Sequence, residues 1–466
     1  MFMQVSLSDI CGFAVCKHGS LAAVVQDFLN RYIMEYIDNQ TLEKPQVILV
    51  GLELPTSDNF EHSMDEMRSL IEACDMEIAY SLTQKLAHPE AGSYLGKGKI
   101  EELITFVKET EAAYCIFEDN LSPAQLRNLQ NEVGIPVWDR TMLILEIFSR
   151  RAKTREARLQ VETAYLQYML PRLTGMWQHL GRQGGGSGSM SNKGIGETQL
   201  ELDRRQIKHR ISELEKELDT ISRTRSVQRQ GRIKGELPQV ALVGYTNAGK
   251  STIMNKLLEI RGVDEEKQVF QKDMLFATLD TSIRKINVEG NHDFLLSDTV
   301  GFIENLPHAL IKAFRSTLEE AINADLILVI LDVSDPYHLQ QKKITEDTLR
   351  ELSAENIPKI YVYNKADLLP DIIFLPKIKE DEIWISAQNN EGLEELTELI
   401  VKSVYKDNQT LVLMLPYTRG DLLNMLHSKA HILSEEYMAE GVLVTADCPI
   451  QLVGLVKEFE YTAKEM

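Results

Sequence analysis

Residues 244–251 read GYTNAGKS, a glycine-containing run that ends in lysine and serine. This spacing is typical of a P-loop, in which backbone N–H groups and the positive end of a helix surround phosphate groups. Lys250 is expected to reach the β- and γ-phosphates, and the Ser251 hydroxyl is expected to ligate Mg²⁺. The candidate nucleotide-binding residues of the loop are Gly244, Tyr245, Thr246, Asn247, Ala248, Gly249, Lys250, Ser251 and Thr252.

A second phosphate element, Asp-Thr-Val-Gly, occupies residues 298–301 and follows the apolar run DFLL. Asp298 is expected to hold Mg²⁺ through water, and the Gly301 N–H is expected to contact the γ-phosphate. Thr299 and Val300 are the remaining candidate contacts of this motif. The motif is short, so its place after the P-loop is what makes it informative.

Between the two motifs lies FATLD, residues 276–280, where a switch segment supplies a threonine to Mg²⁺ in many P-loop proteins. Thr278 is the predicted ligand, with Thr281 and Ser282 as alternatives and an ordinary strand residue as a third interpretation. Phe276 and Ala277 are candidate nucleotide contacts. The predicted catalytic residues are Lys250, Thr278 and Gly301.

Two later motifs decide which base is bound. In Asn364-Lys365-Ala366-Asp367, the Asp367 carboxylate can accept hydrogen bonds from guanine N1–H and N2–H, which adenine does not offer. Asn364 would fix the loop, and the Lys365 stem would pack on the ring. In Ser386-Ala387-Gln388, the Ala387 N–H is placed for guanine O6. The four motifs in this order indicate GTP rather than ATP.

One catalytic group is missing from the pattern. Many small GTPases carry a glutamine after the glycine of the second motif to orient water, whereas this chain has Phe302. Intrinsic hydrolysis should therefore be slow until a partner, the substrate phosphates or a cation completes the site. Asn247 is a candidate K⁺ ligand, with a tight turn as the alternative explanation for an asparagine there.

The elements around these motifs indicate a multidomain α/β protein. Apolar runs alternating with helical patterns predict an N-terminal α/β domain over 1–140 and a P-loop domain over 237–406, mostly a parallel sheet with helices on both faces. Residues 141–236 predict a helical hairpin linker, with one helix from Thr141 to Leu173 and a glycine-rich loop at 181–196. Residues 407–466 predict a small α/β domain with a helix from Gly420 to Glu436.

Charge is distributed unevenly along the 466 residues. The net charge is −20, but the segment from Arg150 to Lys234 holds about 18 Lys and Arg against 9 Asp and Glu. A surface that faces RNA should therefore lie in the middle of the chain, because phosphate rewards clustered Lys and Arg. The candidates for rRNA contact are Arg150, Arg151, Arg155, Arg158, Arg204 and Arg205. The alternative is that each pairs with acids on a solvated helix face.

The five cysteines are scattered and lack a CxxC pair, so we expect buried, reduced thiols. The sequence has neither a basic leader nor an apolar stretch of about 20 residues, so we expect no membrane span and a cytoplasmic location. Nothing in the pattern demands more than a monomer.

Six segments make the pattern more specific. They are YLGKGKIEEL (94–103), FEDNLSPAQLRNL (117–129), VWDRTMLILEIF (137–148), RAKTREARLQVETAYLQYMLPRL (151–173), GIGETQLELDRR (194–205) and LFATLD (275–280). Together with the nucleotide motifs, they resemble the HflX family of GTPases over about residues 45–466.

The resemblance implies a Mg²⁺-dependent GTPase that binds the large ribosomal subunit and the 70S ribosome. Some members split stalled or hibernating ribosomes under stress, and some are reported to bind or hydrolyse ATP through the N-terminal domain. The run Gly96 to Lys99 could then contact phosphate of ATP or RNA. The glycine-rich loop departs from the family pattern, which leaves its contacts open.

Two other functions stay open on the residues alone. One is a regulatory switch that acts on a protein partner. The other is an RNA-remodelling ATPase that uses the N-terminal domain, although residues 1–140 contain no second GxxxxGK[ST] loop.

Overall fold

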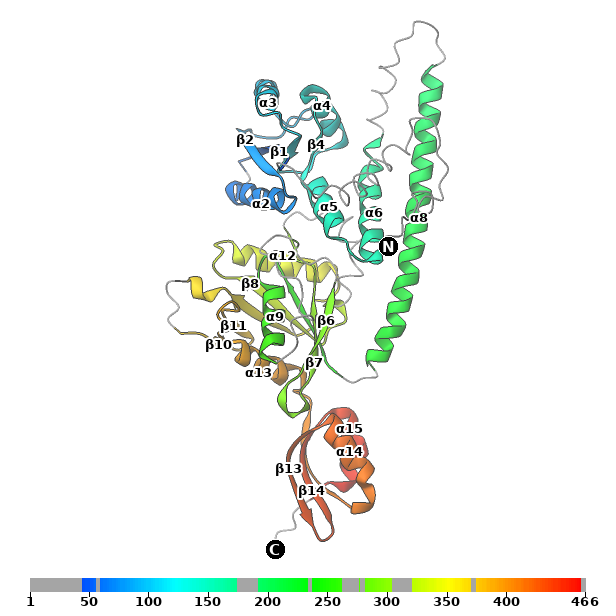
Figure 1. Ribbon diagram of the computed structural model, residues 1–466, viewed down its shortest axis with the longest axis vertical. Helices are drawn as coiled ribbons and strands as arrows, with labels where there is room; N and C mark the ends of the chain where they lie inside the picture. The colour runs from blue at the N-terminus through cyan, green and yellow to red at the C-terminus, as the bar shows by residue number, and fades with distance from the viewer. Residues whose placement is uncertain are drawn as a thin grey trace, which may run out of the picture. The chain divides into compact units, whose positions relative to one another are not determined.

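The computed structural model describes residues 44–55, 59–173, 192–233, 237–261, 276, 281–303, 321–369 and 374–461 (Figure 1). The chain forms two compact units. One comprises Met1–Thr56, Asp75–Val137 and Leu166–Glu213, and the other comprises Ser57–Cys74, Trp138–Tyr165 and Leu214–Met466. The described residues form sheets of four, seven and three strands.

The four-stranded sheet has the order β2-β1-β3-β4, with β1 parallel to both β2 and β3. Its elements are β1 (Gln46–Glu53), β2 (Glu77–Lys85), α3 (Lys97–Thr110), β3 (Tyr114–Phe117), α4 (Pro123–Val133) and β4 (Val137–Trp138). Alternate residues of β1, such as Ile48 and Val50, pack with Leu103 of α3 and Leu129 of α4. The N-terminal α/β prediction is confirmed, although β2, which is largely polar, had not been predicted.

The helical region contains α2 (Phe60–Ala73), α5 (Arg140–Arg151), α6 (Arg155–Met169) and α8 (Asn192–Ile233). The single helix predicted from Thr141 to Leu173 is wrong, because Ala152 is extended and the chain restarts as α6. The Thr154 hydroxyl accepts from the Ala157 N–H at 3.2 Å, so a side-chain cap begins the second helix. The seven-residue apolar repeat persists through the break, since its members are all buried: Leu145, Ala152, Leu159, Leu166 and Leu173.

The glycine-rich loop predicted at 181–196 is corrected at its end, because residues 192–196 are the first turns of α8. Residues 181–191 lie outside the described ranges. Among the described helices, none combines the length and apolar character that a membrane crossing requires.

The seven-stranded sheet has the order β10-β11-β9-β8-β5-β7-β6. Its strands are β5 (Gln239–Gly244), β6 (Ser282–Ile286), β7 (Phe294–Asp298), β8 (Leu326–Asp332), β9 (Lys359–Asn364), β10 (Lys377–Lys379) and β11 (Glu382–Trp384). Its helices are α9 (Lys250–Ile260), α12 (His338–Glu351) and α13 (Leu393–Val404). The pairs β5–β7, β5–β8, β8–β9 and β9–β11 are parallel, while β6 and β10 are antiparallel edge strands.

Both faces of this sheet are covered. Val240 and Leu242 of β5 pack with residues of α9 and α13, whereas Ala241 and Val243 pack with Leu349 of α12. The alternation of side chains along a strand sends successive residues into the two clusters. The predicted mostly parallel sheet with helices on both faces is confirmed.

The three-stranded sheet is antiparallel, with the order β12-β14-β13. Its elements are β12 (Gln409–Leu415), α14 (Gly420–Lys429), β13 (His431–Met438), β14 (Gly441–Cys448) and α15 (Ile450–Val456). The helix predicted from Gly420 to Glu436 is wrong, because α14 ends at Lys429 and the next residues pair with β14. The short 3-10 helices of the second unit are η2 (Glu289–Asn291), η3 (Ala366–Leu368), η4 (Tyr417–Arg419) and η5 (Lys457–Phe459).

The turn between β6 and β7 contacts the small sheet. The Asn291 side-chain amide donates to the carbonyls of His427 and Ala430 at 2.8 and 2.9 Å, which caps the end of α14. Gly290 has φ of 77°, and a Cβ atom there would lie 2.1 Å from His431 Nδ1. A glycine is therefore needed for both the backbone conformation and the close approach.

We expect Gly290→Ala to lower the stability of the second unit by about 1–2 kcal/mol or more, because alanine is strained at this φ and must displace His431. Thermal unfolding should show a Tm drop of roughly 3–8 °C. Gly98→Ala is the matched control, since Gly98 lies in α3 with open space around it. Equal melting temperatures for the two variants would contradict this packing of the turn.

Candidate nucleotide site

The P-loop joins the end of β5 to the start of α9. Gly249 adopts φ of 95°, and a Cβ atom there would lie 2.2 Å from Asn364 Nδ2, so the position requires glycine. Lys250 is buried, and its Nζ donates to the carbonyls of Tyr245 at 2.6 Å and Gly244 at 3.0 Å. Burial lowers the pKa of Lys250 to about 8, and the nearby Asp298 carboxylate opposes that shift. An anion beside this ammonium would raise its pKa again.

The side chains of Ser251 in the P-loop and Asp298 at the end of β7 contact each other. The Ser251 hydroxyl donates to Asp298 Oδ2 at 2.6 Å, and the carboxylate is fully buried. Asp298 ends β7 opposite Leu242 of the neighbouring strand β5, so the parallel register brings the two motifs together. Hard oxygen ligands of this kind fit Mg²⁺.

The other residues of the second motif point in different directions. Thr299 is buried and its hydroxyl donates to the Leu242 carbonyl at 2.7 Å, while Val300 is also buried. A Cβ atom on Gly301 would lie 2.9 Å from Thr246 Cα and 3.0 Å from Lys250 Nζ. Gly301 thus lies so close to the P-loop that a side chain at this position would clash with it.

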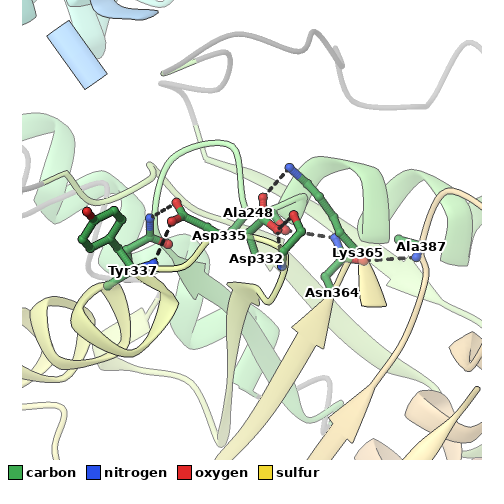
Figure 2. Close-up of polar contacts among 9 residues, drawn as sticks. Ala248, Asp332, Asp335, Tyr337, Asn364, Lys365 and Ala387 are labelled. Carbon is green, nitrogen blue, oxygen red and sulfur yellow. Dashed lines mark hydrogen bonds and ion pairs between the residues drawn. The ribbon is translucent and has the colours of Figure 1, made fainter. Parts of the chain in front are cut away.

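Asn364 links two loops, as Figure 2 shows. Its side-chain nitrogen donates to the Ala248 carbonyl at 2.9 Å, and its oxygen accepts from the Ala387 N–H at 3.1 Å. Lys365, at φ of 60°, places its ammonium 2.7 Å from Asp332 Oδ2 (Figure 2). The P-loop and the segment that contains Ala387 are therefore held at a fixed separation by one amide.

The remaining residues of the base motifs differ in exposure. Asp367 and Gln388 are exposed, so their side chains are open to a ligand. Ser386 is buried, and its hydroxyl accepts from the Asn389 N–H at 3.3 Å. Asp332 was not among the residues singled out from the sequence. Its position at the carboxyl end of a buried parallel strand was the available signal.

Part of the predicted switch lies outside the described residues, including Ala277 and the predicted Mg²⁺ ligand Thr278. Phe276 is buried with φ of 53°. Of the alternatives to Thr278, Ser282 donates through its hydroxyl to Met254 Sδ at 3.6 Å, and Thr281 is half-buried. In the P-loop, Thr252 is half-buried, and Asn247 is exposed with φ of 59°.

Phe302 is held by both its backbone and its side chain. Its N–H donates to the Gly244 carbonyl at 3.0 Å, and its carbonyl accepts from the Thr246 N–H at 2.8 Å. The ring is buried in the cluster that contains Ala241 and Val243. The residue after Gly301 therefore presents no polar side chain to a phosphate group.

The six candidate arginines fall into two groups. Three of them donate to backbone carbonyls: Arg150 to Cys74, Arg151 to Ala73 and Arg158 to Ala152. Among the others, Arg155 is exposed and pairs with Glu217 at 2.9 Å, Arg204 is half-buried and Arg205 is exposed. By exposure, Arg155, Arg158 and Arg205 are open to solvent, whereas Arg150, Arg151 and Arg204 are half-buried.

Comparison with known proteins accounts for most of the chain. Residues 61–149 match the family described as GTP-binding GTPase N-terminal, and residues 151–232 match the GTP-binding GTPase Middle Region. Residues 239–365 match the family described as 50S ribosome-binding GTPase. The three matches follow the order of the predicted domains.

Curated relatives cover nearly the whole chain. The chain is 43% identical to the GTPase HflX of Alkalihalophilus pseudofirmus over 422 residues, which cover 88% of this chain and 95% of that protein. It is 39% identical to the GTPase HflX of Caldanaerobacter subterraneus over 428 residues, which cover 92% and 96%. A GTP-binding protein from Sulfolobus solfataricus, solved in complex with GDP, has a TM-score of 0.41 and 24% identity, covering 78% of this chain and 99% of that chain.

The geometry of the P-loop, the Ser251–Asp298 pair and the Asn364 link agrees with a nucleotide hydrolase, and identity of this extent to curated relatives shows the family. The chain belongs to the HflX family of GTPases, and the reaction it catalyses is the hydrolysis of GTP.

Proposed function

We propose that this protein is a ribosome-dependent GTPase of the cytoplasm, which binds the large subunit and the 70S ribosome as a monomer. Contact with the ribosome would stimulate its hydrolysis, and the GTP cycle would split or rescue stalled or hibernating ribosomes under stress. The observation that carries the proposal is buried Phe302, which leaves the position after Gly301 without a group to orient water. A partner that supplies such a group would control the rate.

Lys250 and Gly301 would bind the phosphate groups of GTP. Lys250 would leave the carbonyls it now contacts and bind the β- and γ-phosphates, and the Gly301 N–H would donate to the γ-phosphate. Ser251 would ligate Mg²⁺ and Asp298 would hold it through water, with Thr278 as a further predicted ligand. The chemistry that Mg²⁺ supplies when bound is neutralisation of phosphate charge.

Guanine would be recognised at the other end of the site. The exposed Asp367 carboxylate would accept from N1–H and N2–H, and the Ala387 N–H would donate to O6. Asn364 holds the Ala387 N–H, so in the bound state that group must share its donor between two acceptors or turn toward the base. Lys365 would cover the base with its stem while Asp332 holds its ammonium.

The basic segment supports RNA as the partner. Arg155, Arg158 and Arg205 are exposed, in a segment whose positive charge contrasts with the net −20 of the chain. The matching family is itself described as a 50S ribosome-binding GTPase. Protein–phosphate contacts of this kind position a factor on RNA without reading its sequence.

The ribosome proposal is tested by measuring GTP hydrolysis alone and with 50S or 70S particles, alongside cosedimentation. We expect hydrolysis to rise at least tenfold with particles, because they complete a site that lacks a water-orienting group. A variant with Arg204→Glu and Arg205→Glu should lose cosedimentation and stimulation while keeping its basal rate. Full cosedimentation of that variant would contradict the assignment of these arginines.

Potassium is tested separately, as a cation that could supply charge beside Asn247. We expect hydrolysis to be faster in KCl than in NaCl at equal ionic strength, and Asn247→Ala should remove the difference. Equal rates in the two salts would mean that Asn247 serves only its left-handed turn.

We expect Asn364→Ala to weaken GDP and GTP binding by about 10- to 100-fold, because both hydrogen bonds that join the P-loop to Ala387 are lost. Fluorescent-nucleotide titration measures the effect. Asn389→Ala is the matched control, since its side chain takes no part in the Asn364 link. Unchanged affinity in Asn364→Ala would show that the two loops are held in place by other contacts.

A further inference from the structure

A buried carboxylate touches the P-loop from outside the nucleotide domain's sheet. Glu66 of α2 accepts hydrogen bonds from the Arg140 guanidinium of α5 and from the Tyr245 hydroxyl. The exposed fractions are 7% for Glu66, 2% for Arg140 and 5% for Tyr245. All three residues belong to the same compact unit.

A carboxylate at this depth is stable only while its oxygens are paired, so the arrangement resists rearrangement. The two oxygens are used differently: Oε2 accepts from Arg140 and Oε1 accepts from Tyr245. The ion pair anchors Glu66, and Glu66 in turn fixes the tyrosine ring. Tyr245 is the second residue of the P-loop, so the Glu66 side chain of α2 holds the start of the loop in place.

The backbone carries this constraint to the phosphate side. Tyr245 forms a β-bridge with Phe302, through the bonds of Phe302 N–H to Gly244 and of Thr246 N–H to Phe302. Phe302 directly follows Gly301, the residue assigned to the γ-phosphate. The Tyr245 carbonyl also accepts from Lys250 Nζ at 2.6 Å. Moving Tyr245 would therefore move the groups on both sides of the γ-phosphate position.

We propose that Glu66 is a positioning residue for GTP hydrolysis, which acts through the Tyr245 hydroxyl and the Tyr245–Phe302 bridge on the Gly301 N–H. This rests on the role assigned to Gly301 above and is independent of the ribosome. The hydrogen bond from the Tyr245 hydroxyl to Glu66, and not the other contacts of α2, carries this effect.

Other contacts hold α2 without touching the P-loop, which allows a matched control. The His62 ring stacks on Tyr337 with centroids 4.1 Å apart, and the Asn59 side chain donates to Gln340. Tyr337 precedes α12, and its backbone N–H donates to Asp335 (Figure 2). Removing the His62 ring takes away one packing contact of α2 and leaves the Glu66–Tyr245 hydrogen bond in place.

The test is single-turnover and steady-state GTP hydrolysis of the full chain without ribosomes, together with GDP affinity. Tyr245→Phe is the deciding variant, because it removes one hydroxyl and keeps the Glu66–Arg140 pair. We expect kcat to fall about tenfold with KM and GDP affinity within twofold, since the Gly301 N–H loses its fixed position. His62→Ala should match the wild type.

Glu66→Ala should lower kcat as Tyr245→Phe does, and the double variant should be no slower than either single one. Unchanged kcat in Tyr245→Phe would overturn the proposal, even if Glu66→Ala fails to fold because it leaves Arg140 buried without its carboxylate. A multiplicative loss in the double variant would also overturn it, as would a loss in His62→Ala equal to that in Tyr245→Phe. Failure of ribosome stimulation alone would affect only the proposed function.

Discussion

The site depends on the in-register parallel pairing of four strands, β7, β5, β8 and β9. Leu242 of β5 lies opposite Asp298 of β7, and Asp332 of β8 lies opposite Asn364 of β9. Parallel strands end at the same edge of a sheet, so residues separated by more than a hundred positions meet there. A shift by one residue would send Asp298 to the opposite face and separate it from Ser251. The hydrophobic clusters on both faces make such a shift costly, because it would exchange the side chains that pack in the two clusters.

At that edge, the polar groups are held by one another. Lys250 donates to two loop carbonyls, Ser251 donates to Asp298, and Asn364 bridges Ala248 and Ala387. Each contact keeps a buried group paired, and several of them would have to be exchanged for contacts with phosphate, cation or base. These mutual contacts together fix the shape of the loop.

The nucleotide motifs and the strands that carry them could be predicted from the sequence, because a P-loop or a buried parallel strand is a local pattern. Phe302 could likewise be identified as an apolar residue at a catalytic position. Features that depend on tertiary context could not. The break at Ala152 contains neither glycine nor proline, and β13 follows α14 with no glycine between His427 and Met438. The polar strand β2 lacks the apolar run that would mark it, and Glu66 lies in an ordinary helical pattern.

Tyr245 and Phe302 explain why an apolar residue can occupy the position after Gly301. Their backbones are paired, while the Phe302 ring is buried in the core and the Tyr245 hydroxyl reaches Glu66. A glutamine at position 302 would have to bury its amide in that cluster or withdraw the side chain, and either choice would weaken the pairing. The structure therefore favours a rigid backbone beside the γ-phosphate over a side chain that orients water. Because the Phe302 side chain packs in the core, the rate of the reaction depends on shifts of the backbone beside the γ-phosphate or on a group added from outside the site.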